Sequence, residues 1–139
     1  MAISKLYDLI LWITPITEAF PRSLRHTLGH RIVNELLDVL RTLVEARYSR
    51  KGRPLLERAN LGIDYARHLI RLSKDLKALS LDRYQHGQKL LEEVGRLIGG
   101  WRKALPGERP RTPVDESISD GSISEWSSTY SATEESRIP

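Results

Sequence analysis

The chain has 139 residues, a length typical of one domain. Its charge is unevenly spread, because residues 1–105 carry a net charge of +8 and residues 106–139 carry a net charge of −4. The absence of cysteine excludes a disulfide framework, a thiolate zinc site and a cysteine nucleophile. The apolar run at residues 9–13 is too short to cross a membrane, and no signal-peptide pattern follows it, so we expect a cytoplasmic protein with no membrane partner.

The first helical pattern covers about residues 4–20. Apolar side chains recur there at spacings of three and four, which place them on one face of a helix. Ser4 is the predicted N-cap, because its hydroxyl oxygen can accept a hydrogen bond from the first turn. Pro15 is expected to kink this helix, since it lacks the N–H that would pair with the carbonyl of Leu11.

Three further helical patterns follow in the chain. One helix is expected over residues 23–48, one over residues 54–76, and one over residues 81–103 with Ser80 as its N-cap. No stretch keeps an alternation with a period of two, so no strand is expected. Four helices with short connections predict an all-α fold, an antiparallel four-helix bundle over residues 1–105.

Residues 106–139 differ in composition from the rest of the chain. They contain four of the seven prolines, no leucine and many Ser and Thr, so too little apolar surface is available to offset the entropy of ordering. We therefore expect a disordered, acidic, Ser- and Pro-rich tail. Three roles stay open for it: a solvated tail, a short docking segment near Trp126 and Tyr130, or an acidic arm that competes for the basic first part.

Patterns typical of catalysis or metal binding are weak. His26 and His30 lie one helical turn apart, which can hold zinc, but Thr27 stands where a metalloprotease needs its glutamate and no third ligand is apparent. Glu92 and Glu93 are adjacent, so on a helix they point about 100° apart and do not form an acid–base pair. We therefore expect no enzymatic activity, no metal and no cofactor.

Small residues recur near the end of the last predicted helix, at Gly95, Gly99 and Gly100. The spacing of four is typical of close helix approach. We interpret it as a contact either inside the bundle or between subunits.

The basic residues are the most informative group. They cluster in the connection after the second predicted helix and recur at spacings of four and three along the third. Two more lie at the start of the second predicted helix. Such ridges are typical of surfaces that neutralise phosphates, which predicts electrostatic nucleic-acid binding with weak sequence specificity. A solvated surface with acidic neighbours is the alternative. The candidate binding residues are Arg22, Arg25, Arg47, Arg50, Lys51, Arg53, Arg67, Arg71 and Lys74.

Five stretches carry a family resemblance: residues 7–12, residues 20–22, Leu28–Gly29 with Arg31, residues 45–49 and, most specifically, residues 93–101. Together they resemble the accessory variability determinants of diversity-generating retroelements. This four-helix-bundle family is related to proteins encoded in intervening sequences of 23S ribosomal RNA genes. The resemblance covers about residues 4–104 and leaves the acidic tail outside.

The resemblance implies a non-catalytic accessory subunit that forms a homopentamer with a positively charged channel. The implied partners are the retroelement's reverse transcriptase, the template RNA and the cDNA, and the complex would support mutagenic reverse transcription that diversifies a target gene. Arg96 lies in the most specific stretch and joins the candidates for nucleic-acid or reverse-transcriptase binding, with pairing to a buried carboxylate as its alternative role. Trp101 is expected to pack rather than stack on a base. A protein-interaction bundle without a nucleic-acid role is the alternative function.

Overall fold

The computed structural model describes residues 1–106, so the predicted tail lies, apart from Pro106, outside the described residues. The all-α prediction is confirmed, and no strand occurs in this part of the chain. None of its helices has the length and apolar content needed to cross a membrane. In chain order the elements are α1 (Ala2–Glu18), α2 (Arg22–Leu24), the π-helical segment η1 (Arg25–Gly29), α3 (His30–Tyr48), α4 (Gly52–Asp75) and α5 (Leu81–Ala104).

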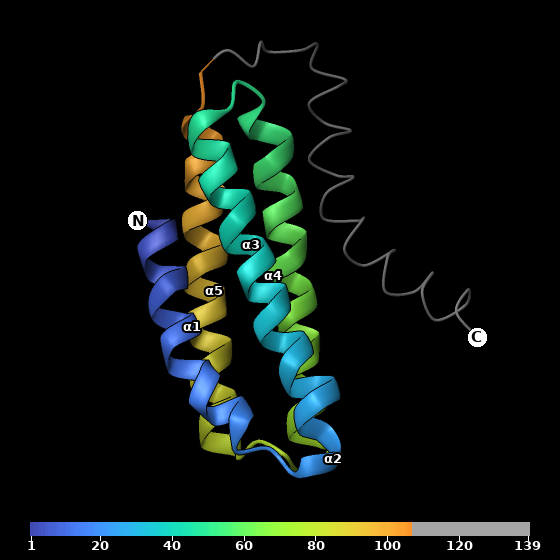
Figure 1. Cartoon of the computed structure of the whole chain (residues 1–139). Coiled ribbons are helices and arrows are strands. Elements are labelled where there is room, and N and C mark those ends of the chain that lie inside the picture. Colours follow the sequence, from blue (N-terminus) through green and yellow to red (C-terminus); the bar gives the residue numbers. More distant parts are fainter. Residues whose placement is uncertain (107–139) are drawn as a thin grey trace, which may run out of the picture. The chain divides into compact units, whose positions relative to one another are not determined.

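The four long helices form an antiparallel up-and-down bundle (Figure 1). Each packs mainly against two others: α3 contacts α1 and α4, while α5 contacts α4 and α1. Neighbours in the chain are therefore neighbours in space, and the α1–α5 contact closes the ring. This arrangement confirms the predicted four-helix bundle.

Leucine and isoleucine side chains at helical spacing fill the core. On α4 the apolar residues at these spacings form one stripe, and every member is buried: Ala59, Gly62, Ile63, Ala66, Leu69 and Ile70. Burial of each large aliphatic side chain contributes about 1.5–3 kcal/mol. The core therefore fixes how α4 is rotated, and with it which residues of α4 face outward.

Gly62 sets the distance between α3 and α4. A Cβ atom at this position would lie 2.5 Å from Cγ2 of Val39 and 2.9 Å from Oε2 of Glu35, both on α3. No side chain fits there without movement of its neighbours. The two helices can approach this closely because residue 62 has no side chain.

Helix α1 begins earlier than predicted, at Ala2, and Met1 is its N-cap. The prediction of Ser4 as the N-cap is wrong, since its hydroxyl donates instead to the carbonyl of Met1 at 3.2 Å. The additional residues join the helix because Ala2 is buried in the core, with 3% of its surface exposed. Pro15 lies inside α1, which continues to Glu18.

The helix predicted over residues 23–48 is confirmed as one continuous helical stretch over residues 22–48, but Arg25–Gly29 form a π-helical turn, η1, between α2 and α3. Leu28 and Gly29, at the end of η1, are buried. A Cβ atom at Gly29 would lie 3.1 Å from the backbone oxygen of Thr17 on α1. The wider π-helical turn therefore ends at a residue that lies close to α1.

Two further contacts fix the last helix. Ser80 is confirmed as the N-cap of α5, where its Oγ accepts a hydrogen bond from the backbone N–H of Arg83 at 3.2 Å. Against α1, the ring of Trp12 meets His86 edge-on, with ring centres 4.7 Å apart.

Candidate nucleic-acid interface

The ten predicted binding residues separate into four groups rather than one surface of the chain. Arg22 and Arg25 lie at the end of the bundle where α3 begins, and four others surround the α3–α4 connection at the opposite end (Figure 1). Three lie on α4 and one on α5. In chain order the second to fourth groups are Arg47, Arg50, Lys51 and Arg53; Arg67, Arg71 and Lys74; and Arg96.

Three of the four cations at the α3–α4 connection are open to solvent, and the fourth, Arg53, is half-buried. Arg47, Arg50 and Lys51 are exposed, and none has a carboxylate partner within ion-pair distance in the described part of the chain. Tyr48 is 79% exposed beside them. Cations next to an exposed aromatic ring suit a nucleic-acid single strand, whose phosphates bind cations and whose bases stack on rings.

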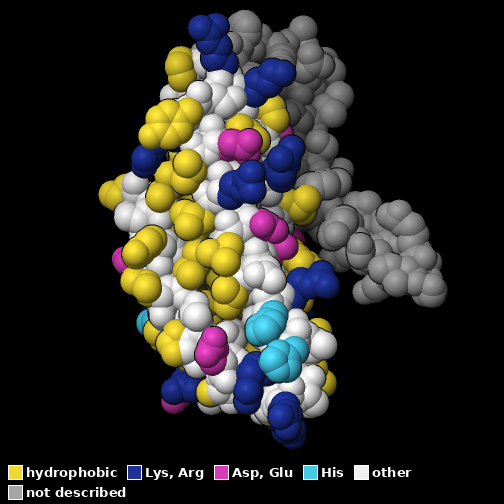
Figure 2. Space-filling model, viewed as in Figure 1, with side chains coloured by type: hydrophobic (Ala, Val, Ile, Leu, Met, Phe, Trp, Pro, Cys, Tyr) yellow, Lys and Arg dark blue, Asp and Glu magenta, His cyan; other side chains and the backbone are white. Residues whose placement is uncertain are grey.

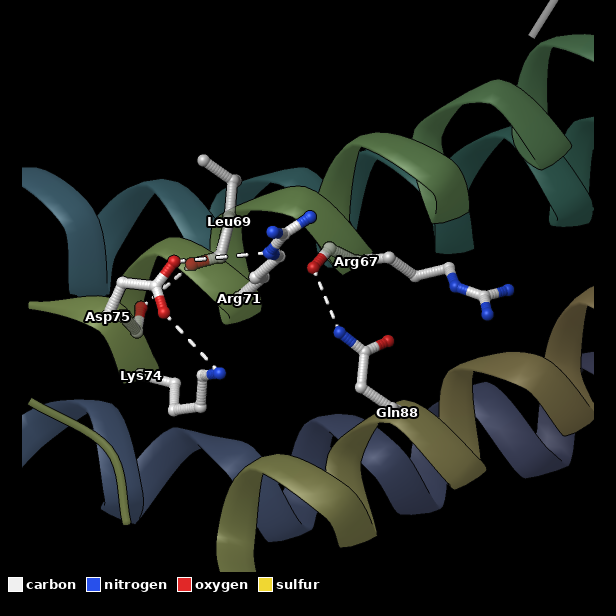
Figure 3. A network of polar contacts seen from close by, with 7 residues as sticks. Arg67, Leu69, Arg71, Lys74, Asp75 and Gln88 are labelled. Carbon is white, nitrogen blue, oxygen red and sulfur yellow. Dashed lines mark hydrogen bonds and ion pairs between the residues drawn. The ribbon is translucent and has the colours of Figure 1, made fainter. Parts of the chain in front are cut away.

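The basic ridge predicted on α4 is partly neutralised by one carboxylate (Figure 3). Asp75 lies 3.4 Å from Nζ of Lys74 and 3.9 Å from Nε of Arg71. The ammonium of Lys74 also lies 4.7 Å from the ring centre of Tyr84 on α5. Arg67 has no ion-pair partner among residues 1–106, so it is the least compensated cation of the ridge.

Between α4 and α5 the ridge borders an open cleft of about 380 Å³. Residues of α4 form its basic wall, and residues of α5 form its polar wall. The residues that line it are Asp64, Arg67, His68, Arg71, Tyr84 and Gln88.

Gln88 connects the two walls of this cleft. Its Nε2 donates a hydrogen bond to the backbone carbonyl of Arg67 at 3.1 Å, from α5 to α4 (Figure 3). Its Oε1 is buried and has no hydrogen-bond partner within the described residues. Buried amide oxygens normally accept a hydrogen bond, so this acceptor is a feature that needs an explanation.

Sequence reasoning missed the α5 wall. Tyr84 is half-buried at the rim of the cleft. Gln88 follows it at a spacing of four, so both lie on one side of α5. The spacing alone does not tell which α4 residues this side meets.

The remaining candidates lie at the end of the bundle where α3 begins and on α5. Arg22 is exposed and Arg25 is half-buried. Arg96 is exposed and has no ion-pair partner in the described part, so it does not pair with a buried carboxylate there. The rings of His26 and His30 meet edge-on with centres 5.0 Å apart. Residues 1–106 contain no group of three or more His, Cys, Asp and Glu that could hold a metal ion.

Gly95, Gly99 and Gly100 of α5 are not needed for close packing inside the bundle. A Cβ atom at Gly95 would meet Asn60 and Ile63 only at ordinary contact distances of 3.7 and 3.9 Å. At Gly99 and Gly100 it would meet nothing within 4 Å. Trp101 packs against the core, as predicted. A role of the glycines in contacts between subunits stays a prediction.

A second feature missed from the sequence is a surface that we call the α1–α3 apolar face. Large hydrophobic side chains lie exposed along both helices, and Figure 2 shows them gathered over this side of the bundle. Val44 is exposed here, because its neighbours Leu43 and Ala46 face the core instead. The exposed members are Tyr7, Leu11, Leu37, Val44 and Tyr48, with Ile3, Ile10 and Leu40 half-buried between them.

Comparison with known proteins gives one match. Residues 1–105 match a protein-family model described as bAvd-like. No curated protein matches the chain. The matched residues include all helices of the bundle and end before the tail.

Proposed function

The chain belongs to the bAvd-like family of accessory variability determinants, and on this premise we propose that it is a non-catalytic subunit of a diversity-generating retroelement. It binds the reverse transcriptase together with template RNA and cDNA in the cytoplasm. Its basic surfaces hold the nucleic acid near the polymerase, which supplies the catalytic carboxylates and metal ions. The complex supports mutagenic reverse transcription.

The observation that carries this proposal is the cation group at the α3–α4 connection. Arg47, Arg50 and Lys51 project from one end of the bundle without carboxylate partners among residues 1–106, and Tyr48 is exposed beside them. Cations that a protein does not neutralise internally remain available for phosphates. The net charge of +8 over residues 1–105 also attracts phosphates, and it does so over longer distances.

The proposed subunit works as a homopentamer, the number that the resemblance implies. The α1–α3 apolar face supports self-association, because exposed apolar side chains that run along two adjacent helices are typical of protein interfaces. A ring of five copies would place five basic groups around one axis and focus their potential. Arg22 and Arg96 contribute to the same basic surface.

Light scattering on the full chain, with and without single-stranded RNA, tests the proposal. We expect a mass near five chains that increases with RNA at low salt. Binding should weaken steeply with salt, with a log–log slope of roughly −0.7 for each phosphate contact. A monomer or dimer whose mass does not respond to RNA would contradict the proposal.

The alternative is a protein-interaction bundle without a nucleic-acid role, and the α1–α3 apolar face favours it. In that case the face would bind a different protein, and the basic side chains would only keep the surface hydrated. Burial of apolar surface responds little to salt, whereas phosphate contacts respond strongly. Partner binding that is insensitive to salt, together with no RNA binding, would select this alternative.

A further inference from the structure

The outward side of α5 carries a row of three exposed cations, Lys89, Arg96 and Lys103, which we call the α5 cation row. We propose that this row binds the phosphates of single-stranded nucleic acid and continues the path that begins at the α3–α4 connection. This inference rests on the proposed function and adds to it the course of the strand over the protein. It is carried by the alignment of the cations, by two glycines between them and by the end of the bundle at which the row begins.

The three cations lie nearly on one line along α5. They follow one another at intervals of seven residues, and seven residues of an α-helix fall only about 20° short of two full turns. Leu91 and Ile98, which are buried in the core, lie on the opposite side of the helix. The rise of an α-helix makes the row about 21 Å long, which is the length of about six nucleotides in a stacked strand. The row can therefore contact several phosphates of one strand.

The cations of this row are not neutralised by the described part of the chain. All three are exposed, and none has an ion-pair partner among residues 1–106. Glu92 lies between Lys89 and Arg96 on the same helix, yet within these residues it forms an ion pair with neither. By contrast, the neighbouring Arg102 is half-buried and bound to Glu57 on α4 at 3.2 Å. The row therefore consists of cations that remain available for phosphates.

Gly99 and Gly100 leave the backbone of α5 uncovered between Arg96 and Lys103. A Cβ atom at either glycine would meet nothing within 4 Å in the rest of the described chain. Glycine inside a helix costs about 0.5–1 kcal/mol relative to alanine, and one use that offsets this cost is the close approach of a ligand to the backbone. A strand that contacts both Arg96 and Lys103 passes over these two residues. The glycines thus give the sugar–phosphate backbone room to lie against the helix.

The row begins at the end of the bundle that holds the α3–α4 connection. Leu105, directly after α5, lies against the start of α4, because a Cβ atom at Gly52 would be 3.4 Å from Cδ1 of Leu105. Figure 1 shows the last turn of α5 beside this connection. Lys103 therefore lies at the same end as the exposed cations of the connection, and the two groups form one path for a strand. The α1–α3 apolar face contains no residue of α5, so self-association and strand binding use different surfaces.

The test measures, by fluorescence anisotropy at several salt concentrations, how the full chain binds an oligouridine RNA about twice as long as the row, about twelve nucleotides. The row variant combines Lys89→Gln, Arg96→Gln and Lys103→Gln. Each lost phosphate contact on a single strand makes the log–log salt slope shallower by about 0.7, so we expect a slope shallower by about two. Helical circular dichroism should be unchanged, because all three side chains are exposed.

A control variant removes the same amount of charge from other exposed positions. It combines Arg41→Gln on α3, Arg58→Gln on α4 and Arg83→Gln on α5, all outside the row. Its net charge equals that of the row variant, so the two share the same loss of long-range attraction. We expect the control to keep the salt slope of the wild-type protein, since it loses no phosphate contact.

Gly100→Leu tests the path of the strand without a change of charge. Its side chain would occupy the open space over α5, so RNA binding should weaken. The helix should persist, because leucine favours a helix more than glycine does. Light scattering without RNA should give the mass of the wild-type protein. Unchanged RNA binding, or a changed mass that assigns the glycines to a contact between subunits, would contradict a strand path over them.

The failure of this inference can be told apart from the failure of the proposed function. If the row variant loses no more of the salt slope than the control, the strand does not follow α5, although the proposed function stands. If the row variant loses its helical circular dichroism, Gly100→Leu decides in its place. If the wild-type protein does not bind the RNA even at low salt, the proposed function fails together with the inference.

Discussion

Gly62 is the residue on which the α3–α4 contact depends. A methyl group there would lie inside the contact radius of Val39, a short, stiff and buried side chain that has little freedom to move away. The same substitution at Gly99 meets nothing within 4 Å. The two positions therefore predict opposite effects of one chemical change.

Gly62→Ala should lower the free energy of unfolding by up to about 2 kcal/mol, because overpacking exceeds the gain in helix propensity. Gly99→Ala should raise it by about 0.5–1 kcal/mol, since only the propensity term applies. Thermal melts followed by circular dichroism measure both. A Gly62→Ala variant as stable as Gly99→Ala would show that α3 and α4 are not held this closely.

Glu35 lies on the same contact and responds to pH. Burial raises the pKa of its carboxyl group, the nearby Asp38 raises this pKa further, and Arg31 lowers it. Because the pKa is higher in the folded state, the stability that Glu35 contributes is fully present below the ordinary pKa of glutamate. It is lost as the pH rises through the raised value.

Glu35→Gln should therefore stabilise the protein at neutral pH, where the wild-type carboxylate is ionised, and lose this advantage near about pH 4. The difference in melting temperature between variant and wild type at the two pH values measures the effect. Glu45→Gln, at an exposed position of the same helix, is the control. An advantage that does not depend on pH would contradict the assignment.

At the scale of helices, α1 and α3 each have two apolar stripes, one facing the core and one facing outward. Leu11 is 61% exposed and Leu37 is 45% exposed, although both belong to helices whose inner sides are fully buried. An exposed apolar stripe of this kind is typical of an interface with another protein chain. For these helices, a second copy of the chain would complete the burial.

Lysine at Leu11 and Leu37 together should reduce the mass in solution to that of one chain, because two ammonium groups would be buried in the interface. Both side chains are exposed within the bundle, so helical circular dichroism should be unchanged. Leu72→Lys, at an exposed position on α4, should keep the oligomer. An unchanged mass in the double variant would place the interface elsewhere.

The elements also show how far the sequence determines the structure. The stripe of α4 and the cap at Ser80 were predictable, because both depend on local spacing and on one hydrogen bond within a turn. The π-helical turn at residues 25–29 was not, since no local spacing marks it and Gly29 at its end packs against Thr17 on another helix.

The candidate site was also predictable from the sequence only in part. Periodicity located Arg67 and Arg71 on one side of α4, where they line the cleft. It could not show that Asp75 would neutralise part of this ridge, or that Gln88 would face it from α5. Both facts depend on how side chains and helices are oriented after packing, which spacing alone does not encode.

At the scale of the whole molecule, charge is the dominant property. Residues 1–105 carry +8 and residues 106–139 carry −4, so the full chain has a net charge of +4. The acidic segment lowers the long-range attraction for nucleic acid wherever its residues lie, within the limits of screening by salt.

A chain that ends at Pro106 should bind single-stranded RNA more tightly than the full chain at low salt, and the two affinities should converge as salt is raised. Fluorescence anisotropy at several salt concentrations measures this, and circular dichroism checks that the helices persist. Weaker or unchanged binding by the shortened chain would exclude the role of the acidic segment as a competitor.

The up-and-down order of the helices has a consequence for how the protein folds. Three of the four main helix contacts join consecutive long helices, so each can form as a hairpin with a short loop to close. Only the seam between α1 and α5, with Trp12 against His86, joins the two ends of the bundle. Local connections of this kind are typical of fast, microsecond-to-millisecond folding. We expect the three hairpins to form first and the seam to close last, so that Trp12 reports the final step of assembly.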